Sequence, residues 1–242
     1  MGIGYGRGGK ARDGLTPEKA APSAWAIKIA YPGSRSGLYW VVNPNVNSGN
    51  PFQVYCDMET AGGGWQLIMQ NTTLGGTELG SSNWGLFNQT NPPTANARAS
   101  VTDSYSIISW ADSFKNPSKS FCYMIEGYER RTFGGVWKAN DPSYSFTQTV
   151  NSATNITLLE GFSDLSYNNS GIEARMPWRS GSGSGYLTTS VSATSSWWGT
   201  LIEGNVPGSY SPAPYISAGV TGAGSTSQNP NVIWYWMRGC EL

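Results

Sequence analysis

The sequence of 242 residues predicts an α+β fold, in which a glycine-rich arm and a short helix precede a short antiparallel meander and a larger, irregular β-rich region. Hydrophobic residues make up 38% of the chain and charged residues only 12%, about half the usual globular share, which argues against a disordered polyelectrolyte. Helix signals cluster near the start, whereas short aromatic and β-branched runs bounded by Gly, Pro and Asn follow them. The length fits one large domain or a domain with an appendage.

The first 35 residues are expected to differ from the rest. Residues 1–15 are glycine-rich and basic, so we expect a flexible or partner-ordered arm. Residues 16–35 carry a connector helix, which Thr16 and Pro17 begin and Pro32-Gly33 ends, and Pro22 could open a second short helix within them. Because so short a helix is marginal alone, we expect it to pack on the main domain or on copies of itself, as an attachment and oligomerisation element.

Residues 36–242 are predicted to form the main domain. Its first part is a meander of strands at 38–42, 52–56 and 65–69, with a Gly62-Gly63-Gly64 turn before the third strand. Further along, we expect a helix at 102–114 and strands at 121–127 and 150–159, while 181–196 and 204–224 are loop-like. The aromatic run at 232–237 predicts a buried central strand.

The cysteine and histidine content excludes several kinds of metal-binding and catalytic site. Cys56, Cys122 and Cys240 form no C-x-x-C pair, so zinc-ribbon and thioredoxin-type sites are excluded. Their odd number favours three buried free thiols, and the alternative is one disulfide, with Cys122 and Cys240 as its most plausible pair. The absence of histidine excludes every mechanism that needs an imidazole.

Charge and hydropathy exclude two kinds of partner. The 15 basic and 15 acidic side chains give no general attraction to nucleic acid or anionic lipid. No segment sustains the roughly 18 apolar residues of a membrane span, and the amino terminus lacks the apolar core of a secretory signal. We therefore expect a soluble product with no nucleic-acid partner and no membrane insertion.

Three short segments in order carry a family resemblance: residues 36–40 (SGLYW), 51–60 (PFQVYCDMET) and 62–65 (GGGW). They resemble the opening of the fibrinogen C-terminal-like domain. The glycines permit a tight reversal with positive φ, and the tryptophan then caps the sheet. The resemblance implies a fibrinogen-like domain that binds ligands through loops in its later half.

The rest of the chain departs from the animal members of that family. Tyr31 and Pro32 occupy the region of their first cysteine, so Cys56 lacks its usual partner. Their acidic calcium loop has no clear counterpart; the nearest candidate supplies only Asp164, Asn168 and Asn169, a thin ligand set for an ion that takes 6 to 8 oxygens. We expect an ordinary turn there and no cofactor, with calcium as the one alternative.

A second resemblance lies ahead of the domain. Residues 13–28, DGLTPEKAAPSAWAIK, resemble the short alanine-rich connector that precedes terminal domains of bacteriophage tail-fibre and related virion proteins. Several such proteins carry a fibrinogen-like tip after that connector. The resemblance implies a phage structural protein that is made in the host cytoplasm and located on the surface of the virion tail or head.

Enzymatic activity is not expected. A glycosidase needs two carboxylates about 5 to 9.5 Å apart across a cleft, and no local motif singles out two of the acidic residues available. The acidic candidates are Asp103, Asp112, Glu126, Glu129, Asp141, Glu160, Asp164 and Glu173.

Binding of a glycan is better supported, because the carboxy-terminal third combines aromatic rings with neutral hydrogen-bonding groups. The expected ligand-binding residues are Trp197, Trp198, Asn205, Tyr210 and Tyr215. Because adjacent strand residues face opposite sides, we expect one of the two tryptophans to be packed and the other to be available to a ligand.

These inferences predict a non-enzymatic phage virion protein, a tail fibre or receptor-binding tip, that adheres to host-surface glycans. Residues 1–35 would contact other virion proteins, and several copies, a trimer in a fibre, would raise weak single-site binding through multivalency. Two alternatives stay open: a structural capsid or tail decoration protein without a specific ligand, and a free-standing, calcium-dependent fibrinogen-like lectin.

Overall fold

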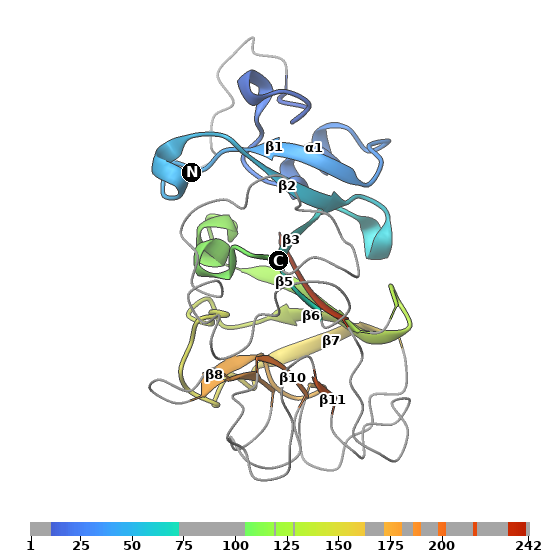
Figure 1. Cartoon of the computed structure of the whole chain (residues 1–242), viewed down its shortest axis with the longest axis vertical. Helices are drawn as coiled ribbons and strands as arrows, with labels where there is room; N and C mark the ends of the chain where they lie inside the picture. The colour runs from blue at the N-terminus through green and yellow to red at the C-terminus, as the bar shows by residue number, and fades with distance from the viewer. Residues whose placement is uncertain are drawn as a thin grey trace.

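A computed structural model places the elements of the chain around one large antiparallel sheet (Figure 1). The structure describes residues 11–72, 105–118, 120–127, 129–162, 172–180, 186–189, 198–201, 215–216 and 232–240. Within them, no helix has the length and apolar character that crossing a bilayer requires.

The large sheet has the strand order β1-β2-β3-β12-β5-β6-β7, and β4 pairs with β3 outside this path. Its first three strands are the predicted meander, and its last strand in sequence lies at its centre. The strands are β1 (Gly37–Val41), β2 (Phe52–Asp57), β3 (Trp65–Thr72), β4 (Tyr105–Ser106), β5 (Phe121–Gly127), β6 (Phe133–Ala139), β7 (Ile156–Gly161) and β12 (Val232–Gly239).

A smaller sheet has the order β11-β10-β9-β8 and lies beyond β7 at the lower end of Figure 1. Its strands are β8 (Trp178–Ser180), β9 (Tyr186–Thr188), β10 (Trp198–Leu201) and β11 (Tyr215–Ile216). The helical elements are short: α1 (Ala24–Ala30) and the 3₁₀ turns η1 (Pro17–Lys19), η2 (Asn47–Gly49), η3 (Thr60–Gly62) and η5 (Ile108–Phe114).

The predicted connector helix is two elements, η1 and α1. Ser23 caps α1, because its hydroxyl accepts the Ala26 N–H at 3.2 Å, and this separates the helix from the extended residues before it. Of the two packing partners that the sequence left open, the described residues show the main domain: Ala24 and Ile27 are fully buried in the core, and α1 lies against β3 and β12.

Residues just before α1 also attach to the sheet. The Trp40 N–H donates to the Gly14 carbonyl at 2.7 Å, and Ala21 forms a parallel bridge with Val41. The outer edge of β1 is therefore covered by this chain's own residues, which removes an open edge that would otherwise invite association. The boundary predicted at residue 35 and the oligomerising role of residues 16–35 stay predictions.

The glycine turn adopts the backbone that the sequence predicts. Gly62, Gly63 and Gly64 all have positive φ, at 86°, 74° and 75°. A Cβ on Gly63 would overlap the main-chain carbonyl of Met58, so glycine is required there. The turn delivers Trp65 into the core, where the indole N–H donates to the Thr60 carbonyl at 2.8 Å.

The aromatic carboxy-terminal run is the predicted central strand. β12 pairs antiparallel with β3 on one side and with β5 on the other, and residues Val232 to Met237 are all buried. It extends two residues beyond the predicted end, so that Arg238 lies opposite Cys122 in β5.

Three local expectations are corrected by the structure. The helix predicted at 102–114 is the strand β4 followed by the 3₁₀ turn η5, because Tyr105 and Ser106 pair with β3. The strand predicted at 150–159 begins only at Ile156. The preference for three free thiols is wrong: Cys122 and Cys240 form a disulfide with their Cα atoms 5.4 Å apart, and only Cys56 is free and buried.

Candidate functional site

The ligand-binding residues expected from the sequence lie mostly outside the described residues. Trp197, Asn205 and Tyr210 fall there entirely, and Trp198 and Tyr215 are placed only by their backbones. Those two backbones belong to neighbouring strands, because Trp198 pairs with Ile216 and Gly199 with Tyr215 across β10 and β11. The small sheet thus places the backbones of two of the five predicted residues on neighbouring strands, one register step apart, and successive positions of a strand face opposite sides of a sheet.

The calcium ligands proposed from the sequence, Asp164, Asn168 and Asn169, also lie outside the described residues. In the part of the chain that the structure does describe, no cluster of three acidic or cysteine side chains is positioned to hold a metal ion. The calcium alternative therefore rests on the sequence alone.

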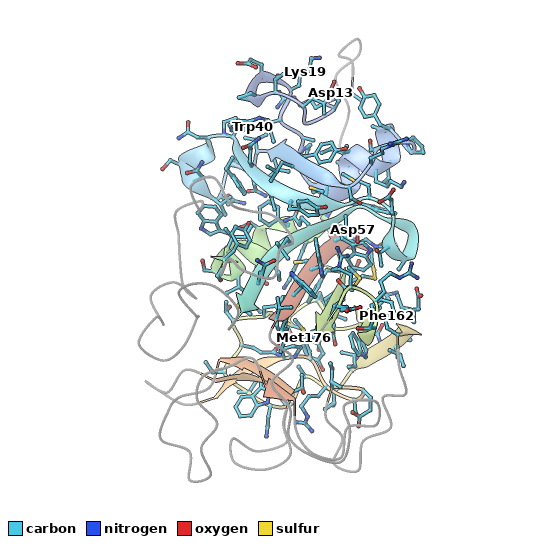
Figure 2. All side chains as sticks on the ribbon, turned by 45° about the vertical axis from the view of Figure 1, so that its right-hand side comes forward. Asp13, Lys19, Trp40, Asp57, Phe162 and Met176 are labelled. Atoms are coloured by element: carbon cyan, nitrogen blue, oxygen red, sulfur yellow. A yellow bond between two sulfur atoms is a disulfide. The ribbon has the colours of Figure 1, made fainter. Side chains whose placement is uncertain are left out.

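A charged cluster joins the meander to the centre of the large sheet. Arg130 donates to Asp57 of β2 and, at 2.6 Å, to Glu126 of β5, and its guanidinium carbon lies 4.4 Å from the centroid of the Trp236 ring. Figure 2 shows Asp57 near the middle of the molecule. Both carboxylates are buried, with 2% and 0% of their surface exposed, so no substrate can reach them.

Electrostatics support a structural role for this cluster. Burial raises the pKa of Glu126, and Arg130 opposes that shift. Burial also acts on Asp57, but hydrogen bonds from Thr60 and Glu59 outweigh it and lower the pKa of that carboxyl. Burial disfavours the charge of Arg130, yet Glu126 and Asp57 together raise its pKa. We interpret the cluster as an internal ion pair between elements far apart in sequence.

Other acidic candidates are engaged in local structure. Asp112 pairs with Lys115 at 3.0 Å and accepts the Ser145 hydroxyl at 2.7 Å. Asp141 accepts both the N–H and the hydroxyl of Ser143, an Asx turn that lowers the pKa of the carboxyl. These contacts describe turns and surface ion pairs, not a pair of carboxylates across a cleft.

The described residues form a pocket of about 410 Å³ beside α1, on the face of the large sheet that carries the disulfide. We call it the disulfide pocket. A volume of this size is within the range of small-molecule sites. The pocket is lined by Trp25, Cys122, Lys138, Leu159, Arg238, Gly239 and Cys240.

Strand register explains why two cations meet there. Arg238 of β12 lies opposite Cys122 of β5, which in turn lies opposite Lys138 of β6. Cross-strand neighbours point to the same face of a sheet, so both cationic side chains flank the disulfide. None of the described residues that line the pocket is acidic.

Arg238 is held firmly in place. Its Nη1 donates to the carbonyls of Ala61 at 3.0 Å and Gly63 at 2.6 Å, so the glycine turn fixes the guanidinium. The guanidinium carbon lies 4.2 Å from the ring centroid of Trp65 and 4.9 Å from that of Trp25. Burial lowers the pKa of Arg238 to about 10, still well above neutral pH, so the group remains a cation.

Sequence reasoning missed this pocket, because its residues come from α1, β5, β6, β7 and β12. One signal was nevertheless present: Arg238 is a charged residue at the end of an aromatic strand, two positions before a cysteine. A cationic side chain in a predicted central strand needs either a counter-charge or access to solvent. Either requirement indicates that Arg238 lies at a polar or open position.

Comparison with known proteins finds one family model and similar solved structures. Residues 28–90, 63 of the 242, match the family model of the fibrinogen beta and gamma chains, C-terminal globular domain. Among solved structures, the chain is similar to the fibrinogen-like globe domain of human ANGPTL6, with 13% identity, a TM-score of 0.49, and coverage of 92% of this chain and 98% of that one. No curated protein matches the chain.

The matched segment begins within α1 and contains the meander and the glycine turn, and these last two carry the resemblance read from the sequence. The predicted fold class is confirmed: the chain has an α+β, fibrinogen-like fold, with a β-rich sheet and a short helix. Fibrinogen-like domains are generally binding modules without catalytic activity.

Proposed function

We propose that this chain is a non-enzymatic bacteriophage virion protein, a tail fibre or receptor-binding tip, which adheres to host-surface glycans through its fibrinogen-like domain. The observation that carries the proposal is the combination of this fold with the alanine-rich segment at residues 13–28, which resembles connectors of phage tail-fibre proteins. Residues 1–35 would contact other virion proteins, and the assembly would be a homo-oligomer, a trimer in a fibre.

The glycan site that we propose lies on the small sheet and the loops around it. Trp198 and Tyr215 lie on neighbouring strands, one register step apart, and Trp197, Asn205 and Tyr210 are close to them in sequence. Aromatic rings bind the C–H face of a sugar, while neutral amides and hydroxyls bind its hydroxyl groups. Each site would be weak, and several copies on one particle would give useful adhesion.

An array of bacterial surface polysaccharides tests the proposal. The full chain, multimerised on beads, should bind a subset of the glycans and leave their masses unchanged after incubation. Trp198→Ala and Tyr215→Ala should each reduce binding at least tenfold. Tyr31→Ala is the matched control: Tyr31 is an exposed aromatic residue that directly follows α1, and Figure 1 shows α1 and the small sheet at opposite ends of the molecule, so binding should persist.

The outcomes separate the alternatives. Binding to no glycan, even after multimerisation, would favour the decoration protein without a ligand. Binding that a calcium chelator abolishes would favour the free-standing lectin. Shortened glycans in the incubation would contradict the non-enzymatic reading itself. Antibody labelling of purified phage particles should find the domain on the tail or head surface.

A further inference from the structure

Within the described part of the chain, no acidic side chain balances the charge of Arg238. Its Nη1 is saturated by the carbonyls of Ala61 and Gly63, but its Nε is buried without a hydrogen-bond partner. None of the carboxylates among the described residues pairs with it. Burying an unpaired charge and an unsatisfied donor is costly, and each exception in a folded protein calls for an explanation.

Arg130 provides an internal comparison. It too lies over a tryptophan ring in the large sheet, but it has two carboxylate partners, Asp57 and Glu126. Holding the glycine turn requires only Nη1 of Arg238, and leaves the rest of the guanidinium, with its planar fork of donors, unused. The two arginines therefore differ in two respects: among the described residues Arg238 has no carboxylate partner, and it lines a pocket.

Lys138 supplies a second positive charge at the same place. It lies two strands from Arg238 in register, lines the same pocket, is half-buried, and makes no ion pair within the described part of the chain. Leu159, with 51% of its surface exposed, and the disulfide contribute apolar surface beside the two cations. A ligand that fits has an anionic group next to C–H groups.

We propose that the disulfide pocket binds the carboxylate or phosphate group of an acidic sugar, with Arg238 and Lys138 as the two cationic contacts. The anion accepts from the free side of the guanidinium and from the Lys138 ammonium, and the C–H groups of the ring contact Leu159 and Trp25. This inference rests on the proposed function, since it names the chemical class of glycan that the domain would recognise, but at a site separate from the small sheet.

The experiment uses the full chain, labelled with ¹⁵N, and three probes: glucuronate, glucose 6-phosphate and neutral glucose. NMR cross-peaks of the Arg238 Nε–H and the Trp25 indole N–H are assigned from Arg238→Lys and Trp25→Phe. Both peaks should shift saturably with at least one acidic probe and not with glucose. A response to glucuronate identifies the anionic group as a carboxylate, and a response to glucose 6-phosphate identifies it as a phosphate.

Lys138→Gln should weaken the affinity about tenfold, the loss expected for one hydrogen bond to a charged group. The Lys138→Gln variant keeps the proposal testable if the Arg238 variants fail to fold. Lys19→Gln is the matched control with the same charge change: Figure 2 shows Lys19 at the outer end of the molecule, where it pairs with Asp13 at 3.4 Å. Its affinity should equal that of the unmodified chain.

The proposal is overturned if neither acidic probe shifts the peaks, if glucose shifts them equally, or if Lys138→Gln leaves the affinity unchanged. The array and the NMR titration test the two proposals separately, so one can fail while the other holds. Array binding to neutral glycans alone, without a response in the pocket, leaves adhesion intact and removes this inference. A Lys138-dependent response to an acidic probe, with no array binding, retains the pocket and removes the adhesin.

Discussion

Replacement of Arg130 by glutamine tests the internal ion pair between the meander and the central sheet. The change leaves Asp57 and Glu126 buried without their cation. Removing one partner of a buried pair costs about 3 to 5 kcal/mol, and we expect the lower end because 31% of the Arg130 side chain is exposed.

The contribution of Glu126 to the loss of unfolding free energy in Arg130→Gln has an upper bound. That residue escapes its unpaired charge by taking up a proton. Relative to an ordinary glutamate with a pKa of 4.5, staying protonated at pH 7 costs at most about 3.4 kcal/mol, at about 1.36 kcal/mol per pH unit. Asp57 keeps its hydrogen bonds from the Glu59 and Thr60 N–H groups, so it adds less.

The pH dependence follows from the direction of this shift. A carboxyl whose pKa is raised in the folded state carries no penalty below its unfolded pKa, and the penalty grows as the pH rises toward the folded pKa. In the Arg130→Gln variant, the loss of stability should therefore be smaller at pH 5 than at pH 7, by up to about 2.7 kcal/mol.

Urea denaturation with the disulfide intact, at pH 5 and pH 7, measures both effects. The neighbouring Arg131→Gln is the matched control, because the Arg131 and Glu160 side chains are 54% and 42% exposed and such a pair contributes about 0.5 kcal/mol. The reasoning is refuted if Arg130→Gln lies within about 1 kcal/mol of the unmodified chain at pH 7, or if its loss is the same at both pH values.

Further predictions concern the turn and the cysteines. Gly63→Ala should cost about 2 kcal/mol or more, because Gly63 has φ 74° and ψ −169°, a region open only to glycine, and a Cβ would strike a main-chain carbonyl. Gly33→Ala, where a Cβ meets nothing within 4 Å, should change the melting temperature by less than about 2 °C. Replacing Cys122 and Cys240 together by alanine should cost about 4 to 5 kcal/mol, because the disulfide closes a loop across 118 residues; an equal urea midpoint with and without it would contradict the pairing. Cys56 should react with a thiol reagent only after unfolding, since it is fully buried and burial raises the pKa of its thiol; rapid modification of the native chain would count against its position in the core.

The local sequence pattern was sufficient to predict the strands and turns that depend only on residues close together in the chain. Alternation and turn residues predicted the strands around Tyr39, Val54 and Leu67, and the three glycines predicted their own positive φ. The burial of the aromatic strand β12 also followed from its composition. In each case the signal lies within about ten residues of chain.

Features that depend on distant pairing were not predictable in this way. The sequence does not state that β12 inserts between β3 and β5, and that insertion is what brings Cys240 to Cys122 and Arg238 toward Lys138. Likewise, pairing with β3 overrode the helical pattern around Tyr105. The candidate pocket is a product of strand register, which only the three-dimensional structure supplies.

A competition assay tests the proposed adhesin role most directly: it measures the adsorption rate of a phage whose particles react with antibody to this chain, in the presence of the free, multimerised protein. The account predicts that a saturating amount of the unmodified chain slows adsorption to host cells several-fold by occupying surface glycans, whereas the Trp198→Ala variant at the same concentration does not. An adsorption rate that the unmodified chain leaves unchanged would contradict it.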